Sequence, residues 1–368
     1  MSSVSETVLE LDLGALHHNY HFLRSKLNPD CKMLAVVKAN GYGGDATTVA
    51  LELQELGVDY LAVAYVNEGL FLRDAGVTLP ILVLHPQPVN FELMVAKCLE
   101  PSIYSERLLE AFSRFASDQK LVAYPVHLKI NTGLNRLGFD PQQATRAADL
   151  VNKSEFLSLR SAFTHLAASE DAAERDFTLG QLAAFDEVLP KLRALGDQKF
   201  FAHATNTSGI LNYPQAHYDL VRSGIGLYGY ANAPELDREL KPVMRLKTVI
   251  SQIHNLQPGD SIGYNRGHVV ASPMKMATLP IGHADGLPRA LGKGVGTVII
   301  NGKQAPIVGN VCMDMIMVDV SEIDCQEGDE VEVFGTIQSA EDLAKKANTI
   351  SYELLTAVGG RIKRVVLR

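Results

Sequence analysis

The stretch Met33-Leu-Ala-Val-Val-Lys38-Ala-Asn-Gly-Tyr42-Gly-Gly-Asp45 decides the fold. Residues 34–37 are apolar and rich in β-branched side chains, which is typical of a strand buried on both faces. The glycine-rich segment 40–44 breaks that strand, and Asp45 is a suitable N-cap for the helical pattern that follows. Lys38 therefore lies at the carboxyl end of a buried strand, where parallel α/β proteins place their sites.

Partial burial would lower the pKa of Lys38 and suit its amine to a Schiff base or to proton transfer. A surface lysine that ends a strand would produce the same local pattern. The stretch alone does not separate the two interpretations.

Length, charge and cysteine usage narrow the class of protein. A chain of 368 residues exceeds one ordinary core, so two domains are expected. A net charge of −8 without a basic cluster argues against nucleic acid and acidic membrane surfaces as partners. There is no signal peptide, no bilayer-length apolar run and no CxxC pair, which indicates a cytoplasmic protein with reduced thiols. His17 and His21 have no third ligand nearby, so no metal site is predicted.

Strand-like and helical runs alternate between residues 33 and 225. This pattern predicts a (β/α)8 barrel, with a doubly wound open sheet as the alternative. The barrel is favoured because candidate site residues follow many strands and do not gather at one switch point. The expected strands are Met33–Lys38, Tyr60–Ala64, Ile81–Leu84, Ser102–Tyr104, Val126–Ile130, Leu159–Phe163, Phe200–Ala204 and Asp219–Ile225.

After residue 230 strands follow one another directly, which predicts a mostly β second domain. The expected domains are residues 1–235 and 236–368. Asn301-Gly302 is a hairpin signal within the second. The half-exposed strand Val8–Leu13 could pair with either domain.

Two loops form a candidate anion site. Asn206-Thr207 follows the seventh expected strand and Arg222-Ser-Gly224-Ile225 follows the eighth. Barrels commonly bind a phosphate between these two loops, so we expect a phosphorylated ligand. Together with Lys38 this indicates either pyridoxal 5'-phosphate held by the lysine or a Schiff-base aldolase that acts on a sugar phosphate. Arg136 would suit a substrate carboxylate, and Tyr264 is either structural or a base.

The ordered set of motifs resembles the alanine racemase family of fold-type III pyridoxal phosphate enzymes, over essentially the whole chain. The matching pieces are Ala35–Gly43, Lys129–Gly138, Thr164-His165, His203–Thr207, Val221–Gly229, Gly263–Asn265, Ile281–Gly286, Val308–Asp314 and Ser351–Glu353.

The resemblance implies a homodimer with head-to-tail subunits and pyridoxal 5'-phosphate bound to Lys38. Lys38 and Tyr264 of the partner subunit would then act as acid and base on opposite faces of the substrate. Arg222 would contact the pyridine nitrogen, with His165 between Arg222 and Tyr264. The phosphate would be held by Tyr42, Thr207, Gly224, Ile225 and Tyr352, and Asn206 would also bind the cofactor. The substrate carboxylate would contact Arg136 and the partner's Met313.

Three residues depart from the commoner family pattern. Thr207 replaces a serine, Asn131 an aspartate and His283 a tyrosine. Lys129 matches a lysine that is carbamylated in some members, and the sequence leaves its modification open. The expected activity is interconversion of L- and D-alanine, which supplies D-alanine for peptidoglycan. A racemase for serine or for a broader set of amino acids shares every motif, while a decarboxylase or a non-catalytic pyridoxal-phosphate-binding regulator fits the second domain less well.

Overall fold

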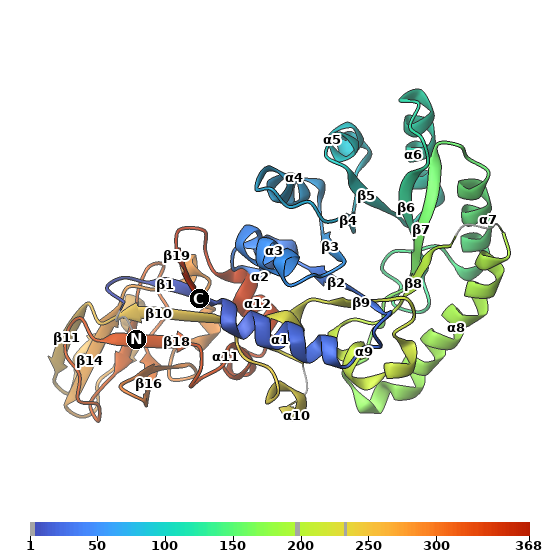
Figure 1. The fold of residues 1–368 in the computed structure, drawn as a ribbon. Coiled ribbons are helices and arrows are strands. Elements are labelled where there is room, and N and C mark those ends of the chain that lie inside the picture. The colour runs from blue at the N-terminus through green and yellow to red at the C-terminus, as the bar shows by residue number, and fades with distance from the viewer. Residues whose placement is uncertain (1–3, 196–198, 232–233) are drawn as a thin grey trace.

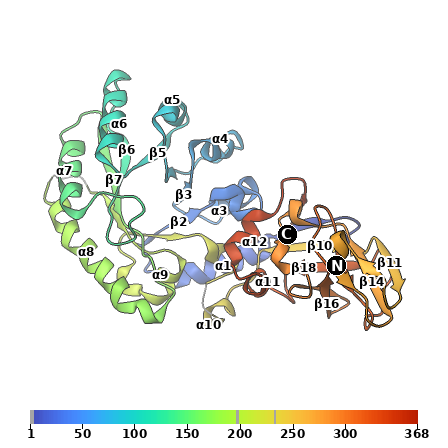
Figure 2. The ribbon, with the colours of Figure 1, turned by 180° about the vertical axis from the view of Figure 1, so that it is seen from behind.

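A computed structural model describes residues 4–195, 199–231 and 234–368. A helix-covered barrel lies beside a second part made mostly of strands, and both termini lie in that second part (Figure 1). Seen from behind, the α12 helix (Ser351–Ala357) stands between the two parts (Figure 2). Nowhere in the described ranges does a helix have the length and apolarity needed to cross a membrane.

The described residues form an eight-stranded sheet in the order β8-β7-β6-β5-β4-β3-β2-β9. All its paired neighbours are parallel. The end strands β8 and β9 approach each other, with bonds from Asp219 N to Ala202 O and from Arg222 N to Thr205 O, each 3.1 Å. The predicted barrel is therefore confirmed in a nearly closed form. Its strands are β2 (Lys32–Val36), β3 (Tyr60–Val63), β4 (Ile81–Val83), β5 (Leu99–Ile103), β6 (Tyr124–Lys129), β7 (Leu157–Phe163), β8 (Phe201–His203) and β9 (Leu220–Ser223).

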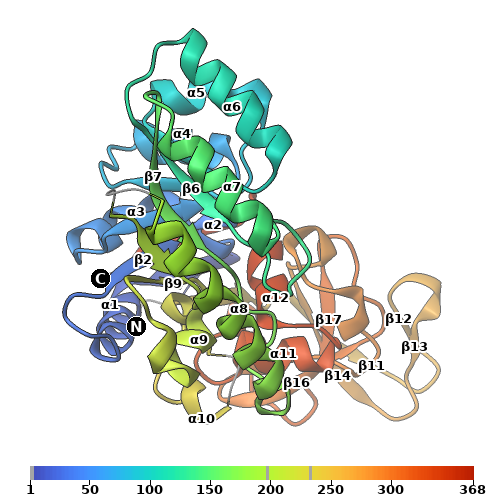
Figure 3. The same ribbon diagram turned by 90° about the vertical axis from the view of Figure 1, so that its right-hand side faces the viewer.

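Helices follow the barrel strands and surround them (Figure 3). Asp45 caps the first of these as predicted, since its carboxylate accepts bonds from the amides of Thr47 and Thr48. They are α3 (Ala46–Glu55), α4 (Val66–Asp74), α5 (Phe91–Ala96), α6 (Glu106–Asp118), α7 (Pro141–Asn152), α8 (Arg175–Arg193) and α9 (Thr207–Asn212), while α1 (Leu13–Ser25) precedes the barrel.

The second part is built on a nine-stranded sheet, as far as the chain is described, in the order β11-β14-β17-β16-β15-β18-β10-β1-β19. Its strands are β1 (Val8–Asp12), β10 (Met244–Val249), β11 (Gln252–Leu256), β14 (Met274–Leu279), β15 (Thr297–Ile300), β16 (Lys303–Val308), β17 (Ile316–Asp319), β18 (Glu330–Phe334) and β19 (Lys363–Leu367). The helix α11 (Ala340–Lys346) precedes α12, and a four-residue α10 (Pro234–Asp237) precedes β10.

The strand β1 pairs with β10 and with β19. The range 1–235 predicted for the barrel therefore begins with a strand of the other sheet. Residues 232 and 233, next to the predicted boundary, lie outside the described residues. The run 244–254 forms two strands rather than one, and β19 is additional to the prediction, because its short, partly exposed sequence lacks a clear alternating pattern.

Two hairpins complete the second part. Asn301 and Gly302 have φ angles of 48° and 76° and join antiparallel β15 and β16, which confirms the hairpin signal. The short strands β12 (Ser261–Ile262) and β13 (His268–Val269) form a hairpin that projects at the margin of the molecule (Figure 3). Tyr264 lies in its turn.

Candidate active site

A cavity of about 380 Å³ opens where the barrel strands end, a size typical of ligand sites. Ten of the predicted site residues line it: Lys38, Tyr42, Arg136, His165, Asn206, Thr207, Arg222, Gly224, Ile225 and Tyr352. Tyr352 belongs to α12, so both parts of the chain contribute to the cavity. The sequence analysis missed Tyr65, His85 and Phe163, which also line it. Tyr65 and His85 follow β3 and β4, the same signal that identified Lys38.

The segment after Lys38 is a left-handed helical turn rather than an open loop. Residues 39–43 all have positive φ, between 53° and 88°. Bonds from Gly41 N to Val37 O and from Gly43 N to Ala39 O close it. Left-handed backbone costs about 1–2 kcal/mol for each residue with a side chain. The turn places Lys38 and Tyr42, at its two ends, on the same cavity.

The surroundings of Lys38 make its amine easier to deprotonate. Burial lowers the pKa of Lys38, and the charge of Arg136 lowers it further. Glu68 opposes this shift. A neutral lysine is the form that attacks a carbonyl or accepts a proton.

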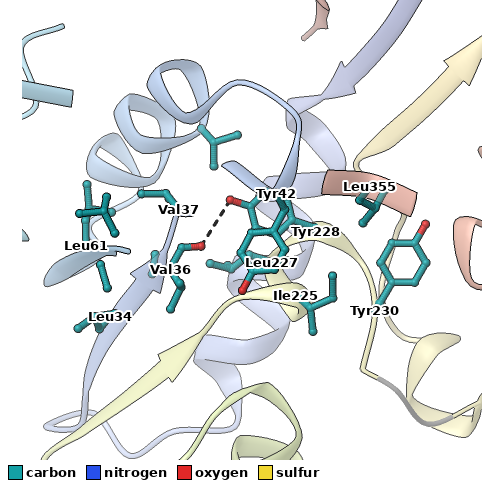
Figure 4. Close-up of a cluster of buried hydrophobic side chains, with 14 of the residues drawn as sticks. Leu34, Val36, Val37, Tyr42, Leu61, Ile225, Leu227, Tyr228, Tyr230 and Leu355 are labelled. Atoms are coloured by element: carbon teal, nitrogen blue, oxygen red, sulfur yellow. Dashed lines mark hydrogen bonds between the residues drawn. The ribbon is translucent and has the colours of Figure 1, made fainter. Parts of the chain in front are cut away.

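Gly224 and Tyr42 are in close contact at one end of the cavity. A Cβ atom at position 224 would lie 2.2 Å from the Tyr42 hydroxyl oxygen, so a larger residue there would displace Tyr42 or the loop. Tyr42 also packs on Tyr228, with ring centroids 4.6 Å apart, between the end of β2 and the loop after β9 (Figure 4). Among the described residues, no group accepts a hydrogen bond from the amides of Gly224 and Ile225.

Thr207 and Asn206 order the neighbouring loop. The Thr207 hydroxyl oxygen accepts a bond of 3.1 Å from Gly226 N and lies 3.2 Å from the Ser223 hydroxyl. The Asn206 side chain caps α9 by accepting a bond of 2.8 Å from Gly209 N. Two available amides, a threonine hydroxyl and a tyrosine hydroxyl make this end of the cavity suited to an anion.

Arg222 is buried and its guanidinium is surrounded by acceptors. It donates to Thr164 O at 2.7 Å and to Ala204 O at 3.0 Å. It also contacts Nδ1 of His203 at 2.6 Å and Nδ1 of His165 at 3.2 Å. Burial lowers the pKa of Arg222 to about 9. Burial, followed by the charge of Arg222, lowers the pKa of His165 well below its usual value, so this imidazole is neutral.

Lys129 also lines the cavity, and its Nζ atom lies 5.2 Å from the centre of the Phe163 ring. Burial lowers its pKa to about 7, and Arg222, Arg136 and Lys38 contribute in the same direction. The Asn131 side chain accepts bonds from the amides of Gly133 and Asn135. Asn131 thus orders the loop that carries Arg136, a task that an aspartate could also perform.

Tyr264 and Met313 do not line the cavity of Lys38 in their own chain. They share a separate surface hollow with Gly263, Cys312, Asp314, Met315 and Met317. Tyr264 is 76% exposed and Met313 is 58% exposed. His283, also exposed, is joined to this hollow by a bond of 2.9 Å from its amide to Cys312 O. The two predicted reacting groups are therefore far from one another in sequence and in separate hollows of one chain.

The family model described as "Alanine racemase, N-terminal domain" matches residues 11–232, and "Alanine racemase, C-terminal domain" matches residues 243–366. A curated alanine racemase of Desulfovibrio desulfuricans is 36% identical over 361 residues, covering 97% of this chain and 96% of the relative. One of Halothermothrix orenii is 37% identical, covering 97% and 96%.

Solved structures show the same relationship. The alanine racemase of Clostridium difficile 630 superposes with a TM-score of 0.93 at 34% identity, covering all of this chain and 97% of that one. The enzyme of Bacillus anthracis with bound L-Ala-P gives 0.91 at 29% identity, covering 100% and 96%. The chain therefore belongs to the alanine racemase family and is an amino-acid racemase, an isomerase.

Proposed function

We propose that this chain binds pyridoxal 5'-phosphate through Lys38 and racemises alanine with two bases that come from two subunits. The observation that carries the proposal is that Lys38, a buried arginine and an anion-binding end share one cavity. Tyr42, Thr207, Gly224, Ile225 and Tyr352 would hold the phosphate, and Asn206 would also bind the cofactor. Arg222 would contact the pyridine nitrogen, and its proton would stay on the guanidinium.

When bound, the cofactor supplies the electron-accepting ring that makes the α-proton of an amino acid removable. The protein supplies the proton acceptors and donors. The lowered pKa of Lys38 leaves its amine able to take a proton on one face of the substrate. A second group must return a proton on the opposite face, because racemisation inverts the carbon.

Tyr264 is our candidate for the second group. It is exposed, and the hollow that it shares with Met313 is separate from the cavity of Lys38. A head-to-tail homodimer would bring this hollow over the partner's cavity and complete the site. His165 would then lie between Tyr264 of the partner subunit and Arg222, in line with its contact to Arg222.

Substrate selection would come from both subunits. Arg136 and the partner's Met313 amide would bind the carboxylate, and Tyr42 and Tyr352 would limit the side chain to a methyl group. The relatives are named alanine racemases, which supports alanine over serine or a broader range. We further propose a cytoplasmic enzyme that provides D-alanine for peptidoglycan.

Two measurements on the purified protein test this function. Borohydride should discharge a yellow absorbance and add mass at Lys38. In heavy water, L-alanine should exchange its α-proton and lose optical rotation, and the same assay with serine measures the substrate range. Cofactor binding without exchange of the α-proton would favour a non-catalytic pyridoxal-phosphate-binding regulator. Release of carbon dioxide from the amino acid would favour a decarboxylase.

A further inference from the structure

A line of hydrogen-bonded side chains runs through the barrel interior from Arg222 to Glu100. Arg222 Nη1 lies 2.6 Å from His203 Nδ1, and His203 Nε2 lies 2.9 Å from Ser161 Oγ. Ser161 Oγ lies 2.7 Å from His127 Nδ1, and His127 Nε2 lies 2.7 Å from Glu100 Oε2. All five residues are buried, and each comes from a different one of the strands β5 to β9.

The two ends of this line determine the direction of every bond in it. Arginine can only donate, so His203 Nδ1 must accept and its proton must sit on Nε2. A carboxylate can only accept, so His127 must donate to Glu100 from Nε2 and accept at Nδ1. The Ser161 hydroxyl then accepts from His203 and donates to His127. Both imidazoles are neutral Nε2–H tautomers, and only this arrangement satisfies every atom.

The charges around the line agree with this arrangement. Burial, followed by the charge of Arg222, lowers the pKa of His203 well below its usual value, so it is neutral. Within the described residues, Glu100 is the one carboxylate connected to Arg222 through this line of hydrogen bonds. Tyr60 donates to the same oxygen of Glu100 at 3.2 Å.

Packing holds the line in place. The Phe163 ring stacks on His203 with centroids 4.8 Å apart and an angle of 4°. The Arg222 guanidinium lies 5.4 Å from the same ring. His203 therefore has little freedom to turn, and what remains variable is which of its nitrogens carries the proton.

We propose that Glu100 is a positioning residue that, through His127 and Ser161, supports the His203 tautomer that Arg222 requires, and thereby holds Arg222 as a donor toward the cofactor. Without the acceptor at Glu100, the proton of His127 can move to Nδ1. His127 could then donate to Ser161, and Ser161 could donate to Nε2 of His203. His203 would then present an N–H group to Arg222, two donors would face each other, and the guanidinium would shift. The consequence for the cofactor rests on the proposed function, whereas the proton arrangement does not.

Nitrogen-15 NMR of histidine-labelled protein tests the proton arrangement with and without pyridoxal 5'-phosphate. The signals are assigned from His127→Gln and His203→Gln variants. We expect both rings as neutral Nε2–H tautomers. A cationic ring or an Nδ1–H tautomer at His203 in the wild-type protein would overturn the proposal, whether or not the protein binds the cofactor.

Two variants and their combination test the influence of Glu100. Glu100→Leu should raise the Kd for pyridoxal 5'-phosphate on the order of tenfold and shift the absorbance of the bound cofactor. Ser161→Ala, which interrupts the line and leaves both ends intact, should have a similar effect. It also keeps the test open if Glu100→Leu does not fold. The matched control is Glu52→Gln, which removes a carboxylate of α3 that is paired with His17 of α1. It should leave the Kd and the absorbance of the bound cofactor unchanged.

The double variant distinguishes positioning from a general structural effect. If Glu100 acts through Ser161, the double variant should be no worse than either single variant, since the second change interrupts a line that is already broken. Additive losses of cofactor affinity, or an unchanged His203 tautomer in Glu100→Leu, would contradict the proposal. Failure of the wild-type protein to bind pyridoxal 5'-phosphate would refute the proposed function and leave the NMR test in force.

Discussion

Glu68 Oε1 accepts a hydrogen bond of 2.6 Å from the amide of Ala39, so a side chain of α4 holds the first residue of the left-handed turn after Lys38. Its other oxygen accepts from the amides of Ala64 and Tyr65 at 2.6 and 3.0 Å. One carboxylate thus joins the loops after β2 and β3. The conformation of the Lys38 turn depends on this acceptor as well as on its glycines.

Glu68→Gln should destabilise the fold by about 0.5–1.5 kcal/mol, because one carboxylate oxygen becomes an amide NH2 group that cannot accept from these backbone amides. It should also lower the pKa of Lys38 further, since Glu68 opposes the existing shift. Urea unfolding measures the first effect. Glu92→Gln, an exposed acid in the first turn of α5, is the control. Equal stabilities of the two variants would contradict the role given to Glu68.

Gly224→Ala should weaken binding of pyridoxal 5'-phosphate strongly, because the new methyl group would lie 2.2 Å from the Tyr42 hydroxyl oxygen. Either Tyr42 or the loop after β9 must then move. Gly180→Ala, on the open face of α8, meets no atom within 4 Å and should leave cofactor affinity unchanged. Fluorescence titration with the cofactor measures both. Normal affinity in Gly224→Ala would exclude Gly224 from the phosphate site.

Lys129 should make stability depend on pH. Its pKa falls from 10.5 to about 7 in the folded protein. Between these values the unfolded chain binds more protons, so the free energy of unfolding rises with pH. Below pH 7 both states are protonated and the full cost of the buried charge remains.

Lys129→Met should therefore raise the free energy of unfolding at pH 7 by about 1–4 kcal/mol. The rise between pH 7 and 10 should flatten, although Lys38 contributes part of it. Urea unfolding of the cofactor-free protein at several pH values measures both effects. The exposed Lys153→Met is the control, and a slope unchanged by Lys129→Met would show that this residue is not the source.

Tyr264→Phe should slow turnover of L-alanine by roughly 10²–10⁴-fold, the usual worth of one acid–base group. The cofactor should remain bound, because Tyr264 does not line the cavity of Lys38 in its own chain. Exchange of the α-proton in heavy water should fall less for one enantiomer than for the other, because Lys38 alone can remove and return the proton that faces it. Tyr218→Phe, at the outer surface of the barrel beside Asp186, controls for loss of a tyrosine hydroxyl. Loss of the cofactor from Tyr264→Phe would count against its assigned role.

The barrel and its site were predictable because local patterns agree with the final fold. Runs such as Leu34–Val37 mark strands buried on both faces, and the residues just beyond them meet at one edge of a parallel sheet. Lys38, Thr207 and Arg222 could therefore be placed together from sequence order alone.

Features that depend on pairing across long distances could not be read in this way. The strand β1 pairs with β10 and β19, which lie more than 200 residues away in the sequence. The sequence of β1 therefore left open which sheet it joins. The positive φ angle at Ala39 is supported by its bond to Glu68 and by the bonds of the turn, and an alanine gives no sign of it in the sequence. The line of hydrogen bonds from Arg222 to Glu100 could not be predicted from the sequence, because its five residues come from five different strands.

The central claim is that Lys38 and Tyr264 act on one carbon atom from two copies of the chain. Lys38→Ala and Tyr264→Phe homodimers should each be nearly inactive. Unfolding and reassembling an equal mixture with cofactor should restore about a quarter of wild-type racemase activity, because half of the dimers are mixed and each has one intact site. No recovery in mixed dimers, isolated with two different affinity tags, would contradict the account.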